Sequence, residues 1–220
     1  VLLPDAMAGD RLYPTLYVLP ALTGEDQSVG NGLQEIQRLG LHNRYGLICV
    51  RPIFNAIPWY ADHPSDPGLR QESHFVKAVV PFVERELPVA SDTNQRWLVG
   101  FSKSGWGAYS LLLRHPDLFG KAAAFDSPLM HDKPDRWNSQ DVFATQENFE
   151  RYRITTLLEQ SAGRLREKSR LVLLGHGNFR DHVTRAHELM TRLGICHEYV
   201  DGPQRAHRWD SGWLSDAIRL

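Results

Sequence analysis

The most constraining stretch of this chain is a short apolar strand, residues 97–99, that passes through a glycine- and serine-rich turn into a helical run, residues 108–113. A strand and a helix joined by so tight a turn nearly touch, so the side chains around the turn must be small. The serine at the tip of such a turn is held in a strained backbone conformation, and its hydroxyl is exposed above the sheet. Ser102 occupies this tip and is therefore the candidate nucleophile.

The pattern Gly-x-Ser-x-Gly of such turns is matched at Gly100 and Ser102, whereas Ser104 stands in place of the last glycine. If Ser104 were the nucleophile, Trp106 would occupy a glycine position and clash with the strand. We therefore assign the role to Ser102, and the N–H of the next residue, Lys103, is the first candidate donor to an oxyanion. The alternative interpretation is a turn that merely links strand to helix.

The length of 220 residues suits a single α/β domain with a substantial core. Lys and Arg number 25 and Asp and Glu 26, so the net charge is −1. A chain with so little net charge has no strong field to attract nucleic acid or an acidic membrane, and we expect a small, neutral or weakly charged ligand. No apolar run approaches the length of a membrane helix, and the chain opens on Val1 without a methionine or a leader-type segment. This start is typical of a trimmed or processed chain, so no compartment is predicted.

Cys49 and Cys196 lie in or beside apolar runs, where unpaired thiols behave as small core residues, and we expect no disulfide. The ten histidines include no His-Glu-x-x-His motif and no Cys/His cluster with zinc spacing. We therefore expect neither a metal nor another cofactor.

Short strand-like runs alternate with amphipathic helical patterns along the chain. The runs are residues 1–3, 15–19, 47–50, 97–99, 122–125, 171–174 and 198–200, and the helical patterns cover residues 29–39, 72–87, 108–114, 147–159 and 181–193. Such alternation predicts a mostly parallel sheet with crossover helices on its faces. Because ligands of such sheets bind at the carboxyl ends of the strands, we expect the site in the strand-to-helix loops.

The first of these loops starts at Pro20, directly after the strand 15–19. A serine hydrolase would place a second oxyanion donor here, and by position we assign the N–H of Leu22. An ordinary glycine-containing turn is the alternative interpretation.

A longer excursion, residues 52–64, contains three prolines and no periodicity. Its Trp59 and Tyr60, together with Trp106 after the serine turn, are the candidate substrate-binding aromatic side chains. Trp59 and Tyr60 also suit the apolar side of a packed loop.

Residues 129–146 show little periodicity and scatter aromatic side chains such as Trp137 and Phe143 among polar ones. We interpret this segment as a small cap-like insertion over the cleft, mobile and outside the core, within one domain that spans residues 1–220.

The last third of the chain supplies the candidates for the base and the acid. A strand at residues 171–174 is followed by a loop with Asp181, a helix, a strand at residues 198–200 and a loop with His207. This is the order serine, acid, histidine of an α/β-hydrolase, in which His207 would be the base. Asp181 is the favoured acid, although it could simply stabilise the start of the helix. Asp126, at the end of the strand 122–125, is the alternative, and a Ser102–His207 pair without an acid is the third possibility.

Several segments together resemble the esterase D-type α/β-hydrolases, the group that includes feruloyl and acetyl esterases and S-formylglutathione hydrolases. They are residues 100–108, 114–119, 194–199 and 207–209, and the similarity extends over nearly the whole chain. The resemblance implies an α/β-hydrolase fold with Ser102 as nucleophile and His207 as base.

Three positions depart from the pattern of that family. Its His-Gly oxyanion dipeptide is Pro20-Ala21 here, the last glycine of the serine turn is Ser104, and the position of its acid is Asn178. These departures bear on the oxyanion donors and on the identity of the acid.

The preferred interpretation is a serine hydrolase that cleaves a small carboxylic ester through an acyl-enzyme. The three departures keep open a degenerate, non-catalytic protein of the same fold that binds a small ester or a sugar. An acyltransferase is a further alternative, because it would use the same residues and differ only in excluding water from the acyl-enzyme.

Overall fold

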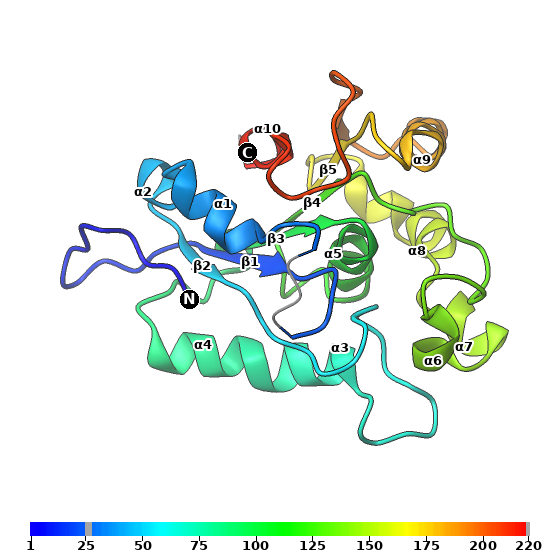
Figure 1. Cartoon of the computed structure of the whole chain (residues 1–220), viewed down its shortest axis with the longest axis horizontal. Helices are drawn as coiled ribbons and strands as arrows, with labels where there is room; N and C mark the ends of the chain where they lie inside the picture. Colours follow the sequence, from blue (N-terminus) through cyan, green and yellow to red (C-terminus); the bar gives the residue numbers. More distant parts are fainter. Residues whose placement is uncertain (25–27, 219–220) are drawn as a thin grey trace.

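The computed structural model describes residues 1–24 and 28–218, and a six-stranded sheet forms its centre (Figure 1). The strands are β1 (Thr15–Leu19), β2 (Ile48–Val50), β3 (Arg96–Phe101), β4 (Lys121–Phe125), β5 (Leu171–Leu174) and β6 (His197–Val200). Their order is β2-β1-β3-β4-β5-β6, and each neighbouring pair is parallel. The predicted α/β class is confirmed. Residues 1–3 were expected to be a strand, but they contribute only an isolated antiparallel bridge between Leu2 and Cys49.

Helices cover both faces of the sheet (Figure 1). One face carries α1 (Gly32–Arg38), α2 (Leu41–Tyr45) and α10 (Trp213–Ala217). The other carries α3 (Gln71–His74), α4 (Val80–Glu86), α5 (Lys103–Arg114), α6 (Ser139–Phe143), α7 (Gln146–Glu150), α8 (Ile154–Ser161) and α9 (Arg180–Arg192). A π-helical turn, Phe75–Val79, joins α3 to α4.

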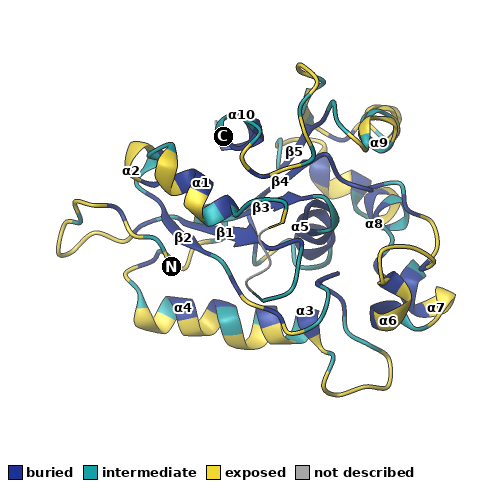
Figure 2. Ribbon diagram, in the orientation of Figure 1, coloured by how far each residue is buried: buried dark blue, intermediate teal, exposed yellow. Residues whose placement is uncertain are grey.

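The alternation of side chains along the strands divides the core in two. In β1, Tyr17 and Leu19 point into the larger core with α5, whereas Leu16 and Val18 point into the smaller core beneath α1 and α10. This two-residue period follows from the pleat of a strand. Because both faces are covered, all five residues of β1 are buried, as the dark strands of Figure 2 show.

The chain changes direction across the sheet at β1 and β3. From β1 it moves outward to β2, and it then returns to place β3 on the other side of β1. The loops that leave β1 and β3 therefore diverge at the carboxyl ends of these strands, the position at which sheets of this kind bind ligands. The loop that starts at Pro20 and the turn at Ser102 lie next to each other at this edge, since Leu19 and Gly100 are register partners.

Residues 129–146 are less separate from the domain than expected. They form α6, and Leu129, Val142 and Phe143 lie in the larger core with at most 1% of their surface exposed. The prediction that this segment stays outside the core is wrong for these three side chains, because they are part of the larger core, where the Phe143 ring packs against Trp106 of α5. Trp137, by contrast, lies at the molecular surface.

Cys49 is buried as predicted, whereas Cys196 is exposed, and both thiols are free. In residues 1–24 and 28–218, none of the helices has the length and apolar character needed to span a bilayer. The same residues contain no group of three or more His, Cys, Asp or Glu side chains that could hold a metal ion.

Candidate active site

Ser102 forms the turn between β3 and α5 with φ 54° and ψ −127°, a strained conformation for a residue with a side chain. Glycines let the strand and the helix approach. A Cβ on Gly100 would lie 2.0 Å from the carbonyl oxygen of Ser104, and one on Gly105 would lie 2.8 Å from the Cβ of Ser127. The strained turn expected from the sequence is therefore present.

Ser104, which stands where the family has glycine, is completely buried. Its hydroxyl donates a hydrogen bond to the carbonyl oxygen of Phe101 at 2.8 Å and accepts one from the N–H of the same residue at 2.9 Å. The side chain thus folds back onto the end of β3. This position tolerates serine because the hydroxyl finds both partners locally, and it leaves Ser102 as the serine of the turn whose hydroxyl faces a histidine.

Three side chains from three loops meet at the carboxyl edge of the sheet. The Nε2 of His207 lies 3.1 Å from the Oγ of Ser102, and its Nδ1 lies 2.6 Å from the Oδ2 of Asp126. His207 lies in the loop after β6, Ser102 directly follows β3, and Asp126 directly follows β4. Because Nδ1 faces a carboxylate, it carries a proton, and Nε2 is left free to accept one from the serine hydroxyl.

Asp126 is completely buried, with φ 42°, and backbone donors surround its carboxylate. Oδ1 accepts the N–H of Phe179 at 2.7 Å, and Oδ2 accepts the N–H of Asn178 at 3.2 Å in addition to the bond with His207. The loop can wrap so closely because residue 177 is glycine: a Cβ on Gly177 would lie 2.5 Å from Oδ2. These donors offset the cost of burying a carboxylate.

The geometry reverses the order of preference between the two candidate acids. Asp181 lies in the first turn of α9 with 77% of its side chain exposed, and it pairs with Arg185 at 3.5 Å. Among the described residues no hydrogen bond joins it to His207, so the partner of the histidine is Asp126. A carboxylate in the first turn of a helix is stabilised by the helix dipole, and this accounts for Asp181.

The three aromatic side chains expected to bind substrate are core residues instead. Trp59, Tyr60 and Trp106 each expose 0% of their surface. Trp59 packs edge-on against Trp106 with ring centroids 5.5 Å apart, and the Trp106 ring packs at the same distance from Phe143. The expectation that these side chains are exposed in a cleft is corrected: His131 and Phe143 help to cover Trp59, Phe143 also packs on Trp106, and Phe54 and Phe75 pack against Tyr60.

Tyr60 instead links the serine helix to the loop after β1. Its ring lies so close to α5 that a Cβ on Gly107 would come within 2.1 Å of it, and its hydroxyl donates to the carbonyl oxygen of Pro20 at 2.8 Å. Burial raises the pKa of this hydroxyl well above its ordinary value, so the hydroxyl stays protonated and donates. The backbone of Tyr60 has φ 56°, a further strained position near the site.

The two backbone groups predicted to bind an oxyanion lie at neighbouring strand ends. Lys103 is the first residue of α5, directly after Ser102, and Leu22 is the third residue after β1. Since β1 and β3 are paired, the two loops begin side by side at the same edge of the sheet. The assignment of both N–H groups remains a prediction.

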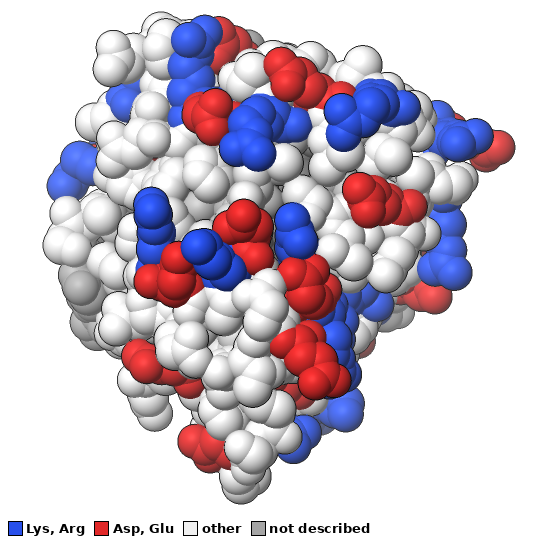
Figure 3. Space-filling model, turned by 90° about the vertical axis from the view of Figure 1, so that its right-hand side faces the viewer, with Lys and Arg blue, Asp and Glu red and all other residues white. Residues whose placement is uncertain are grey.

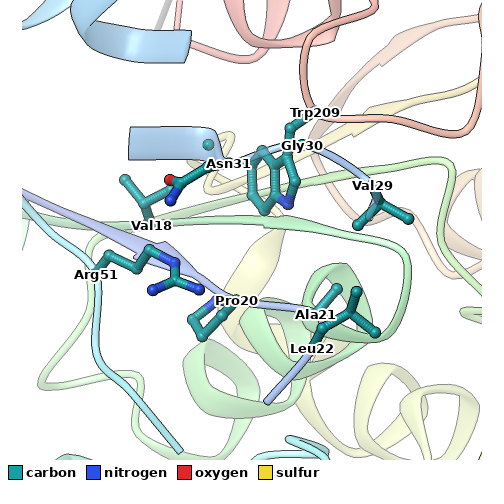
Figure 4. Close-up of a pocket in the computed structure, with 10 residues that line it drawn as sticks. Val18, Pro20, Ala21, Leu22, Val29, Gly30, Asn31, Arg51 and Trp209 are labelled. Atoms are coloured by element: carbon teal, nitrogen blue, oxygen red, sulfur yellow. The ribbon is translucent and has the colours of Figure 1, made fainter. Parts of the chain in front are cut away.

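A small cavity lies behind Leu22 (Figure 4). Its volume is about 10 Å³, room for about one water molecule and too little for a substrate. The lining residues are Val18, Pro20, Ala21, Leu22, Val29, Gly30, Asn31, Gly32, Arg51 and Trp209. The guanidinium of Arg51 points toward Pro20 and donates to the carbonyl oxygen of Gly24 at 3.1 Å, which ties β2 to the loop after β1.

Charged side chains on one face of the molecule are mixed in sign. On the face shown in Figure 3, acidic and basic groups alternate, and no large patch of one sign is visible. Close pairs such as Arg180 and Asp201, 2.6 Å apart, neutralise one another. This surface offers no broad electrostatic attraction to a highly charged partner.

Comparisons with known proteins identify the family and the fold of this chain. Residues 1–194 match the family described as "Putative esterase". A search of curated proteins found no match. Similar solved structures include a ferulic acid esterase, with a TM-score of 0.71, 21% identity, and coverage of 95% of this chain and 83% of that chain.

Two further similar structures come from Staphylococcus aureus. The S-formylglutathione hydrolase FrmB has a TM-score of 0.77 and 16% identity and covers 98% of this chain and 89% of its own. The fluorophosphonate-binding serine hydrolase FphF has a TM-score of 0.77 and 16% identity, with 99% of this chain and 88% of its own covered. At these identities the structures establish the α/β-hydrolase fold, and the family match covers most of the sequence. The chain therefore belongs to this esterase family and has the α/β-hydrolase fold.

Proposed function

We propose that Ser102 is the nucleophile of this esterase, that His207 is its general base and that Asp126 is the acid that orients the histidine. One observation carries the proposal: the unbroken series of hydrogen bonds from Ser102 Oγ to His207 Nε2 at 3.1 Å and from His207 Nδ1 to Asp126 at 2.6 Å. The substrate is a small-molecule carboxylic ester, which suits a surface of mixed charge.

Hydrolysis would proceed in two halves. As Oγ of Ser102 attacks the acyl carbon, Nε2 of His207 takes its proton and then gives it to the departing alcohol oxygen, so that the acyl group remains on Oγ. In the second half His207 takes a proton from water, the hydroxide oxygen attacks the acyl carbon, and the proton returns to Oγ as the ester bond breaks. The buried carboxylate of Asp126 stabilises the imidazolium that forms in both halves.

The negative oxygen of each tetrahedral intermediate requires donors that are already in place. We assign the N–H groups of Lys103 and Leu22. The hydrogen bond from Tyr60 to the carbonyl oxygen of Pro20 supports the second assignment, because it fixes the loop two residues before Leu22. Tyr60 is therefore a positioning residue in this scheme.

Replacement of Tyr60 by phenylalanine keeps the ring but removes the bond to Pro20. We expect kcat for p-nitrophenyl acetate to fall about tenfold with little change in KM, less than the 10²–10³-fold loss typical when an oxyanion donor itself is removed. The measurement is steady-state kinetics together with a thermal melt.

Tyr109→Phe is the matched control for that variant. The Tyr109 hydroxyl is equally buried and donates to the carbonyl oxygen of Val172 at 3.1 Å, away from the loop after β1. Both variants lose one buried hydrogen bond, so their melting temperatures should fall similarly while only Tyr60→Phe loses kcat. Equal kinetics in the two variants would refute the positioning role.

Two alternatives lose support from the geometry. Three departures from the family pattern kept open a non-catalytic protein, and one of them, Asn178 in place of the acid, is offset because Asp126 supplies a carboxylate to His207. An acyltransferase must keep water away from the acyl-enzyme, whereas 22% of the His207 side chain is exposed to solvent. This exposure favours hydrolysis.

The experiment that tests the assignment is labelling with a fluorophosphonate, followed by peptide mapping. An activated Oγ displaces fluoride and forms a phosphonate ester, so we expect one adduct, on Ser102. Ser104→Ala should still be labelled and Ser102→Ala should not. An adduct on another serine, or none, would contradict the proposal.

A further inference from the structure

A line of aromatic rings leads from His207 to the molecular surface. The Phe179 ring centroid lies 5.5 Å from that of His207, and the Trp137 ring lies 5.3 Å from Phe179 in an edge-to-face contact. Phe179 is only partly buried, and Trp137 exposes 36% of its surface. This contrasts with Trp59, Tyr60 and Trp106, which are sealed in the core.

These two rings are held firmly in place. The N–H of Phe179 is bound to Asp126 at 2.7 Å, and its ring packs edge-on against His182 at 5.5 Å. The carbonyl oxygen of Trp137 accepts the indole N–H of Trp59 at 3.3 Å. The Trp137 backbone has φ 54°, a conformation that persists only where the surroundings enforce it. The surface is thus preorganised and does not need to form around a ligand.

Two further histidine rings touch these aromatic rings. The ring of His131 lies 5.2 Å from that of Trp137, and His182 contacts Phe179. Burial lowers the pKa of both histidines, and it outweighs the opposing effect of nearby carboxylates. The N–H of Met130 donates to the Nδ1 of His182 at 3.1 Å, which further favours an uncharged ring with its proton on Nε2.

The mechanism determines which half of a substrate would lie here. His207 must hand its proton to the leaving oxygen, so the departing alcohol lies on the side of the imidazole, whereas the acyl group stays on Ser102. Phe179 is in contact with that imidazole. We infer that Phe179 and Trp137 form the binding surface for the leaving alcohol and that this surface accepts a flat, uncharged ring. The inference rests on the roles proposed above for Ser102 and His207.

The shared chemistry of such alcohols is a ring with a flat apolar face, either an aryl group or the C–H face of a sugar. Contacts between rings contribute about 3- to 10-fold in affinity beyond their buried area. The preference should therefore appear as a ratio between esters that have the same acyl group and different alcohols.

The test compares acetate esters of primary alcohols, so that intrinsic reactivity differs little. We would measure kcat/KM for ethyl acetate, benzyl acetate and 6-O-acetylglucose, together with ethyl phenylacetate, which carries its ring on the acyl side. The variants are Trp137→Ala and Phe179→Leu, the second of which keeps apolar bulk against His207. Phe82→Ala is the matched control, because Phe82 is an aromatic side chain on α4 that exposes 55% of its surface.

We expect the ratio of a ring-bearing acetate to ethyl acetate to fall about 3- to 10-fold in both variants and to stay constant in Phe82→Ala. A fall for benzyl acetate identifies an aryl alcohol, and a fall for 6-O-acetylglucose identifies a sugar. The inference is overturned if neither ratio changes, or if the ratio for ethyl phenylacetate falls instead, which would place the acyl group on this surface. Hydrolysis of ethyl acetate by Ser102→Ala is measured separately, because its persistence would refute the proposed nucleophile whatever the ratios show.

Discussion

Ser102→Ala is expected to lower kcat/KM for p-nitrophenyl acetate by about 10⁴-fold or more, because the members of a catalytic triad act as a unit. The Oγ that accepts the acyl group is removed, and His207 has no proton to take from alanine. Steady-state kinetics at matched protein concentration measures the loss. A thermal melt should show a folded protein, because the strained backbone at φ 54° is set by the surrounding glycines and not by the serine hydroxyl.

Ser104→Ala is the control from the same turn. Its hydroxyl bonds only to the backbone of Phe101 among the described residues, so its loss should cost about 1 kcal/mol of stability. Turnover should stay close to that of the unmodified chain. If Ser104→Ala were inactive and Ser102→Ala active, the nucleophile would be Ser104 and the assignment of Ser102 would be wrong.

The fold could be predicted from the sequence because its signals are local. The buried runs of β1 and β5 have the length and composition of central strands, and their predicted bounds agree with the structure. The helix 181–193 shows the same agreement with α9 to within one residue. Short helices such as α2 and α10 have only five residues each, too few for a periodic pattern, and they were missed.

The acid could not be chosen from the sequence because the choice depends on sheet order and loop path. Asp126 and Asn178 are far apart in the chain, and only the pairing of β4 with β5 brings them together. Gly177 then lets the loop after β5 close around a carboxylate that comes from the neighbouring strand. A glycine next to Asn178 is a weak signal for this arrangement, and Asp181 in the same loop offered a competing carboxylate.

Burial of the candidate aromatic residues was equally a tertiary effect. Every residue of α5 from Ser104 to Leu113 is buried, because the sheet covers one side of the helix and residues 129–146 help to cover the other. This cover comes from segments far away in the chain. The sequence alone shows only that Trp106 lies close to the nucleophile, and for that reason it was predicted to bind substrate. Phe179, whose ring contacts His207, and Trp137, whose ring contacts Phe179, lie in segments without periodicity, where nothing local indicates contact with an active site.

Asp126→Asn is expected to reduce kcat/KM by about 10⁴-fold, the loss seen when the acid of a triad becomes an amide. An asparagine amide that faces Nδ1 of His207 donates a hydrogen, so Nδ1 must accept and the ring proton moves to Nε2. Nε2 would then donate to Ser102 Oγ and could no longer take its proton. The N–H of Phe179 can still bond to the amide oxygen at the Oδ1 position, whereas the N–H of Asn178 loses its acceptor at Oδ2. We expect the variant to remain folded in a thermal melt, with a lower melting temperature.

Asp181→Asn is the matched comparison, with the same chemical change at the other candidate acid. Its carboxylate is exposed and paired with Arg185, so we expect activity close to that of the unmodified chain. The reverse result, a large loss in Asp181→Asn alone, would require α9 to rearrange around His207 and would refute the geometry described above. Near-normal activity in both variants would show that Ser102 and His207 work as a pair, and the short bond between His207 and Asp126 would then be structural only.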